Sequence, residues 1–329
     1  MRIGWIDMLR GFAILCILYF HTEMYYAGTD VLPYALYVDG VLSTFFFISG
    51  YLLLKGDIDS FDWKRRMRSI VRKLVIPYFV FTTLIAILKA CASSQPVNLQ
   101  EIAISIITGN ASWFVAALIV AEVIITLLLA AIRSEWVFGA FMPVSLVVVQ
   151  IWGNRLSSYY LDFDFWHWQE ASLGCFFMSL GALYRLYEGY LTKLLGNRFV
   201  IVALLIGFCV TKFIVLTNSL EMMFGPIVVS SFPLFVVDNI LMVVLLIMLF
   251  KIIPYVQWLG VTGKRSLVIY FVCGAVPLLV SKAFLTMGIH YSALSMPLVF
   301  TLVCVLASLI AFIIYRYLPF LVGVKNIQQ

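Results

Sequence analysis

The first long apolar stretch of the chain, residues 6–27, carries an arginine and a histidine eleven positions apart. Arg10 lies near its start and His21 lies beyond its middle. Eleven residues make about three helical turns, so we expect both side chains on one helix face, roughly 16 Å apart along the axis. A guanidinium group binds phosphate oxygens, and a neutral imidazole accepts a proton from a hydroxyl group near neutral pH. Arg10 and His21 together therefore predict a site that binds an anion and activates a hydroxyl group.

Each of these residues also has a structural interpretation. Arg10 can anchor the helix at the cytoplasmic surface, where its long side chain reaches the lipid headgroups. His21 lies deeper, where contact with lipid is costly, so it must face the protein interior or a wet cavity. A buried structural histidine remains the alternative for His21. Glu122, an acid in the middle of a later apolar segment, is a further candidate for the same cavity.

The composition is that of an integral membrane protein. The 329 residues are 64% hydrophobic and 12% charged, and the mean hydropathy is +1.06, whereas soluble domains are about half apolar and a quarter charged. The net charge of +6 comes from residues between apolar segments, which indicates membrane topology and no nucleic-acid partner. The six cysteines form no CxxC pair, so neither a disulfide framework nor a metal site is predicted.

We predict an all-α polytopic fold with about ten transmembrane helices in a single domain over residues 1–329. A spanning helix needs about 20 mainly apolar residues, and ten segments qualify, two of them short. No internal repeat and no soluble appendage is visible. The predicted spans are 6–27, 36–54, 74–92, 112–131, 137–152, 169–187, 199–216, 231–250, 266–287 and 294–316.

The positive charges predict the orientation. With the N-terminus in the cytoplasm, most of the 22 Lys and Arg residues fall in loops on the inside. Basic residues accumulate in cytoplasmic loops, so we expect both termini in the cytoplasm and a protein of the cell (inner) membrane. One predicted outer loop, 159–168, is rich in aromatic and acidic residues. It is either an interfacial aromatic belt or a surface on which a sugar stacks.

Five segments, in order along the chain, resemble the signatures of the acyltransferase 3 family of integral membrane acyltransferases. The first is 6–21, in which an Arg is followed after ten residues by a His. The others are 45–52 (FFFISGYL), 72–78 (a basic run ending in Pro-Tyr), 112–118 (a Trp-Phe segment) and 263–270 (GKRSLVIY). Each motif alone is weak to moderate, whereas five in order are strong.

This resemblance implies a ten-helix membrane enzyme that moves an acyl group, usually acetyl, from acyl-CoA to a hydroxyl of an envelope glycan or lipid-linked sugar. It implies no permanently bound cofactor. His21 would be the general base, with Arg10 positioning the acyl-CoA. The coenzyme phosphates would bind near Arg10, Arg65, Arg68 and Arg72, although a topology signal and contact with anionic membrane lipids explain that basic cluster equally well.

The other motifs suggest residues that bind substrate. Ser49 and Gly50 form a small pair that either lines a substrate path or permits close helix packing. Trp113 is either an interfacial anchor or a gate on which the acceptor stacks, and Tyr270 belongs to the late motif. Relatives often place a His shortly after that Tyr, but this chain has Cys273 in that neighbourhood.

Two functions remain open on the sequence alone. The leading one is a membrane O-acyltransferase. The alternative is a transporter or flippase of a lipid-linked or polar solute, because buried charges and an exposed aromatic loop would serve it too. The acceptor and the acyl chain length are not predicted.

Overall fold

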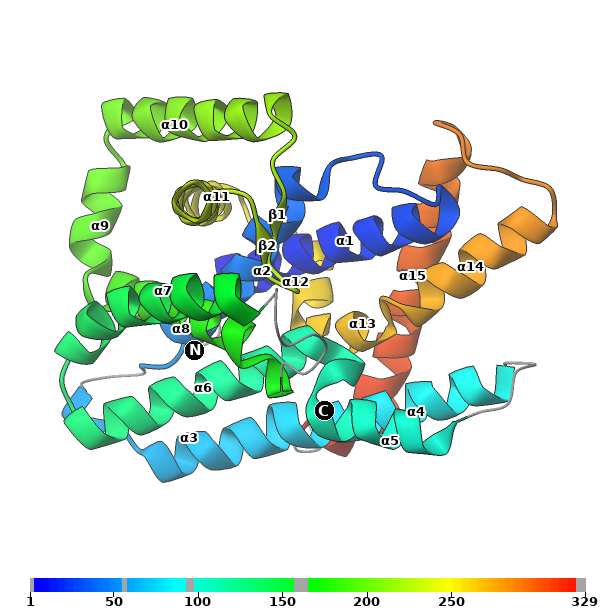
Figure 1. Cartoon of the computed structure of the whole chain (residues 1–329), viewed down its shortest axis with the longest axis horizontal. Coiled ribbons are helices and arrows are strands. Elements are labelled where there is room, and N and C mark those ends of the chain that lie inside the picture. The colour runs from blue at the N-terminus through cyan, green and yellow to red at the C-terminus, as the bar shows by residue number, and fades with distance from the viewer. Residues whose placement is uncertain (1–2, 55–57, 93–97, 157–164, 324–329) are drawn as a thin grey trace.

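The computed structural model describes residues 3–54, 58–92, 98–156 and 165–323, and Figure 1 shows their arrangement. The six residues 159–164 of the predicted aromatic loop lie outside the described part. The long helices are α1 (Gly4–Tyr26), α2 (Tyr34–Tyr51), α4 (Ile76–Ala92), α6 (Trp113–Ile132), α7 (Trp136–Leu156), α8 (Trp168–Leu186), α10 (Arg198–Thr217), α11 (Phe232–Ile252), α14 (Ala275–Thr286) and α15 (Ser295–Tyr317).

Shorter elements connect them. These are α3 (Trp63–Ile70), α5 (Leu99–Thr108), α9 (Glu188–Leu195), α12 (Gln257–Lys264) and α13 (Ser266–Val272), a π-helical segment η2 (Val71–Val75), and the 3-10 turns η1 (Ile58–Ser60), η3 (Asn110–Ser112), η4 (Phe165–His167) and η5 (Pro319–Val322). Strands β1 (Met222–Met223) and β2 (Val228–Val229) form an antiparallel hairpin with Met222 opposite Val229.

The prediction of an all-α membrane protein is confirmed, with this short hairpin as the addition. Each of the ten predicted segments coincides with helical structure. By length and apolarity, six helices of the described chain are candidates to cross a membrane, namely α1, α3 continuing into α4, α6, α10, α11 and α15. The pair α13 and α14, bent by 48°, makes a seventh candidate. The count of ten spans stays a prediction, because α2, α7 and α8 do not pass that test.

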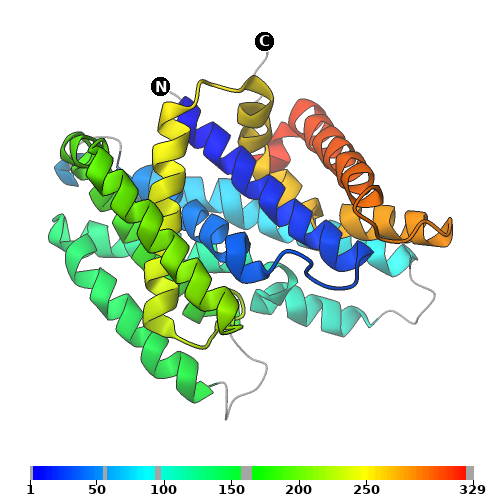
Figure 2. The same ribbon diagram turned by 90° about the horizontal axis from the view of Figure 1, so that it is seen from above.

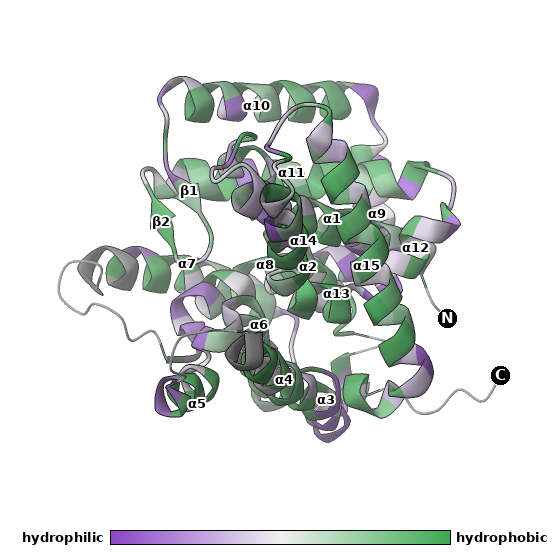
Figure 3. Ribbon diagram, turned by 90° about the vertical axis from the view of Figure 1, so that its right-hand side faces the viewer, coloured by the Kyte–Doolittle hydropathy of each residue, from purple (hydrophilic) through white to green (hydrophobic). Residues whose placement is uncertain are grey.

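Both ends of the described chain lie on one side of the molecule, as Figures 2 and 3 show for the start of α1 and the region after α15. This arrangement is compatible with two cytoplasmic termini, which stay a prediction. In Figure 3 α3 is coloured mainly as hydrophilic, whereas most of the long helices are coloured mainly as hydrophobic.

The basic run that precedes the predicted third span is helical. Asp62 caps the N-terminus of α3, where its side chain accepts a hydrogen bond from the backbone N–H of Arg65 at 3.0 Å. Ile70 is buried, whereas Arg65 and Arg68 are exposed, so α3 has one face against the protein and one charged face outside. The helix continues through η2 into α4.

Helix α1 lies at the centre of the molecule and packs against α2, α11, α12, α13, α14 and α15. Its crossing with α12 depends on a glycine in each helix. A Cβ atom at Gly11 would overlap the carbonyl oxygen of Leu259, and one at Gly263 would overlap that of Asp7. Small residues let two backbones approach closely in a membrane protein. Gly11, from the first family-like motif, and Gly263, from the last, therefore both belong to the contact between α1 and α12.

Candidate active site

His21 lies in the wall of a cavity of about 600 Å³. The imidazole is partly buried, with the Phe20 ring 5.6 Å away edge-on and the Tyr25 ring 6.4 Å away in a stacked orientation. Neighbouring aromatic rings restrict its orientation. The sequence predicted that His21 must face the interior or a cavity, and the structure places it at a cavity.

Five more parts of the chain form the walls. They are α4, α5 with its cap Asn98, the turn η3 with the first residue of α6, α13, and the break before α14. The lining residues besides His21 are Thr82, Ile85, Ala86, Asn98, Glu101, Ile102, Ser105, Ile106, Asn110, Ala111, Ser112, Trp113, Tyr270, Phe271, Cys273, Gly274 and Ala275. The lining thus combines aromatic rings with hydroxyl, amide and carboxyl groups.

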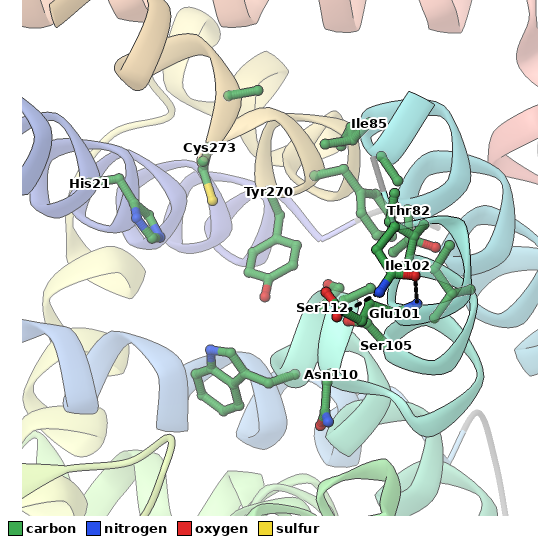
Figure 4. A pocket seen from close by; sticks show the side chains of 18 residues that line it. His21, Thr82, Ile85, Glu101, Ile102, Ser105, Asn110, Ser112, Tyr270 and Cys273 are labelled. Atoms are coloured by element: carbon green, nitrogen blue, oxygen red, sulfur yellow. Dashed lines mark hydrogen bonds between the residues drawn. The ribbon is translucent and has the colours of Figure 1, made fainter. Parts of the chain in front are cut away.

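The break between α13 and α14 brings two residues of the late motif to the cavity. Tyr270 lies in the last turn of α13, and Cys273 lies at the break itself. Figure 4 shows the side chains of His21, Cys273 and Tyr270 directed toward the same space. The Tyr270 ring packs against Phe114 at 5.3 Å, which fixes its position beside the start of α6. Cys273 therefore lines the same cavity as His21.

The remaining predicted residues lie elsewhere. Within the described chain, the lining of this cavity includes neither Arg10 nor Arg65, Arg68 and Arg72. Arg10 is partly buried next to the crossing of α1 and α12, and the three other arginines are exposed on α3 and η2. A role of these four residues in binding a coenzyme stays a prediction.

Glu122 is paired across to α3. Its carboxylate accepts hydrogen bonds from Nε of Arg66 at 3.0 Å and from Nη2 at 2.6 Å, a two-pronged geometry. The Glu122 side chain is 5% exposed and that of Arg66 is 19% exposed. The pair therefore attaches the basic helix α3 to α6, and Glu122 is not among the described residues that line the cavity.

Ser49 and Gly50 lie where α2 crosses α8. A Cβ atom at Gly50 would overlap the carbonyl oxygen of Met178, and one at Gly181 on the opposite helix would overlap that of Phe47. The packing interpretation of the small pair thus has a direct structural basis. A contribution of Ser49 or Gly50 to a substrate path stays a prediction.

Sequence reasoning missed the contribution of α5. Residues 93–111 read as an outer loop, yet Leu99–Thr108 form a helix whose polar residues Glu101 and Ser105 line the cavity. Asn98 accepts hydrogen bonds from the backbone N–H groups of Gln100 and Glu101, and its amide donates to the Glu101 carboxylate at 2.7 Å. The spacing Asn-x-x-Glu is the available signal for this helix start.

The chemistry that the cavity permits is proton transfer to an imidazole next to an apolar and hydrogen-bonding surface. Among the described residues, no group of three or more His, Cys, Asp and Glu side chains is arranged to hold a metal ion. The arrangement allows His21 to act as a general base on a hydroxyl group that enters the cavity.

Comparisons with known proteins give one match. The sequence profile of the acyltransferase domain matches residues 3–316, nearly the whole chain. No curated protein and no solved structure matches. A profile that covers the chain from the first turn of α1 to the end of α15 includes both His21 and Tyr270 at the cavity. The protein is therefore a member of the acyltransferase 3 family of membrane acyltransferases.

Proposed function

We propose that this protein transfers an acyl group, with acetyl as the first choice, from acyl-CoA to a hydroxyl of a cell-envelope glycan or lipid-linked sugar. The observation that carries the proposal is the position of His21 in a polar and aromatic cavity, in a chain of an acyltransferase family. The family membership favours an enzyme over a transporter or flippase. The proposed location is the cell (inner) membrane.

The reaction uses His21 as the base. The acceptor hydroxyl enters the cavity and gives its proton to the imidazole while its oxygen attacks the thioester carbonyl carbon. The tetrahedral intermediate collapses by breaking the carbon–sulfur bond, which releases the ester product and the coenzyme A thiolate. The proton on His21 returns to that thiolate, so the overall reaction consumes one hydroxyl and one thioester and yields one ester and one thiol.

The acceptor would be held by the mixed lining of the cavity. The rings of Trp113 and Tyr270 offer flat apolar surfaces, and Glu101, Asn110 and Ser105 offer hydrogen-bonding groups. Sugars present both kinds of surface, because their ring carbons are apolar on one face and hydroxyl groups surround them. Aromatic side chains combined with a few placed polar groups are typical of small-molecule sites.

The donor would bind from the other end of α1. Coenzyme A carries several phosphates that cannot enter hydrocarbon, so its head would stay at the cytoplasmic surface near Arg10 and the exposed Arg65, Arg68 and Arg72. Its thin pantetheine arm would extend along α1 toward His21. The spacing of Arg10 and His21, roughly 16 Å along the helix, suits such an extended arm.

The test compares two histidine variants in cells. Envelope glycans are analysed by mass spectrometry from cells that produce the wild type, His21→Ala or His290→Ala. His290 lies on an exposed loop and is the matched control. The wild type and His290→Ala should add the mass of one acyl group to a glycan, and His21→Ala should abolish that addition at equal protein level. Normal acylation by His21→Ala would overturn the role of His21.

A second experiment tests the donor. Purified protein in detergent receives acetyl-CoA and an extract of envelope glycans, and free coenzyme A is measured as a thiol. An acyltransferase releases coenzyme A when the extract is present. No release with any acyl-CoA would refute the proposed reaction.

A further inference from the structure

Trp113 lines the cavity and also lies against the β1–β2 hairpin and against His167. A Cβ atom built at Gly225, in the turn of the β1–β2 hairpin, would lie 2.6 Å from Cε3 of the indole. The His167 ring stands 6.3 Å away, and the Phe224 ring 6.2 Å away. Trp113 also lines the cavity that contains His21. The Trp113 side chain is therefore shared between the cavity lining and the contact with the hairpin and His167.

The hairpin behind Trp113 is anchored in the protein core. Phe224 is fully buried and stacks on Phe46 of α2 with the ring centres 5.5 Å apart. Its ring also lies 6.3 Å from those of Phe177 and Phe235. Interiors packed in this way resist displacement. A side chain added at Gly225 should therefore displace the Trp113 indole and leave the hairpin in place.

Glu170 connects the two supports of the indole. One carboxylate oxygen accepts a hydrogen bond from the backbone N–H of Ile227 in the hairpin at 3.2 Å. The other lies 3.5 Å from Nδ1 of His167. The Glu170 side chain is 4% exposed and that of His167 is 14% exposed. Glu170 thus links the β1–β2 hairpin to His167 beside the Trp113 ring, although the hairpin lies more than 50 residues further along the chain.

We propose that the hairpin turn at Gly225, with His167 and Glu170, holds the Trp113 indole as the wall that limits the size of the group entering the cavity. Gly225 is then a specificity-determining residue, and His167 and Glu170 are positioning residues. The inference rests on the proposed function only for the nature of that group, which is the part of the acceptor that carries the hydroxyl.

The substitution Gly225→Ala provides the test. The added methyl needs the volume that the indole occupies, so it displaces the ring toward the cavity and narrows the path to His21 and Cys273. Replacing the indole by a smaller ring in the same chain, Gly225→Ala with Trp113→Phe, reopens the path. Gly139→Ala is the matched control, because a Cβ atom at Gly139 would have no neighbour within 4 Å.

The readout is chemical modification of Cys273, which lines the cavity. The purified full chain is treated with methyl methanethiosulfonate or with a bulky biotinylated methanethiosulfonate, and the rate at Cys273 is followed by mass spectrometry of its peptide. Gly225→Ala should slow the bulky reagent several-fold more than the small one. The double variant should restore the ratio, and Gly139→Ala should leave it unchanged.

Other results overturn the inference. It fails if Gly225→Ala has the wild-type ratio of rates, if the double variant does not restore it, or if the small reagent does not reach Cys273 in the wild type. If Gly225→Ala does not fold, the single variant Trp113→Phe tests the inference. It must raise the rate at which the bulky reagent modifies Cys273 more than the rate of the small reagent, and equal changes would overturn the inference.

The two proposals fail separately. One outcome is that Cys273 is labelled as expected but the wild type releases no coenzyme A from acetyl-CoA in the presence of the glycan extract. This outcome refutes the proposed function and leaves the role of Gly225 intact. Coenzyme A release by the wild type, with labelling of Gly225→Ala unchanged, refutes the role of Gly225 alone.

Discussion

The ion pair between Arg66 and Glu122 allows a quantitative test of how the basic helix α3 is held. Glu122→Leu leaves a guanidinium without its carboxylate, and Arg66→Met leaves a carboxylate that is 5% exposed without its guanidinium. Removing one partner of a buried pair costs about 3–5 kcal/mol of folding free energy. Glu122→Leu should lie at the lower end of that range, since Arg66 is 19% exposed and can turn toward water.

The double variant should behave differently from the sum of the two single variants. Arg66→Met combined with Glu122→Leu replaces the pair by apolar side chains of similar volume, a change that is often neutral or stabilising. We expect the unfolding free energy of the double variant to lie within about 1 kcal/mol of the wild-type value. The coupling free energy between the two positions is then several kcal/mol. The measurement is equilibrium unfolding of the purified protein in mixed micelles with increasing dodecyl sulfate.

Acyl transfer by the same variants tests the sequence-based role of Glu122. If Glu122 acts only by holding α3, the double variant keeps the wild-type release of coenzyme A. If Glu122 binds substrate, the double variant is as inactive as Glu122→Leu although its stability is normal. Losses of stability that simply add in the double variant would refute the pairing argument, because independent sites are additive.

Three further predictions concern helix contacts and pH. Gly50→Ala should lower the unfolding free energy by about 1–3 kcal/mol in the same unfolding assay, because the new methyl separates α2 from the Met178 carbonyl. Gly263→Ala should reduce coenzyme A release together with stability, since it displaces the helix that carries His21; wild-type kinetics would contradict this. Burial raises the pKa of Glu188, but hydrogen bonds from Lys251 and other groups lower it more, so the net shift is downward. The stability from this carboxylate is present above its unfolded-state pKa and is lost as the pH falls through the folded-state pKa. The melting temperatures of Glu188→Gln and the wild type should therefore converge in acid, and a constant difference would contradict the ion-pair explanation.

The contribution of α5 shows where hydropathy reasoning stops. This helix has 10 residues, too few to cross a membrane, and its polar cap Asn98 and Glu101 resemble loop residues in the sequence. A window tuned to long apolar runs therefore passes over it. Its polar side chains nevertheless line the cavity beside His21.

The sequence by itself determined the membrane class, the helical segments and the placement of His21 away from lipid. These follow from interactions with the surroundings and from helix geometry, which act within a few residues of the chain. It also determined the family, through motifs that keep their order. The motif glycines could be noted but not interpreted, because their function depends on a backbone atom of another helix.

Only the tertiary structure decided which residues meet. It joined Glu122 to Arg66, 56 positions away, and it brought Trp113 against Gly225. It also separated the cavity around His21 and Tyr270 from the arginines of α3. Such contacts depend on how whole helices pack, and packing depends on the shapes of both partners. A pattern confined to one segment carries no information about the partner, so the walls of the cavity could be seen only in the folded chain.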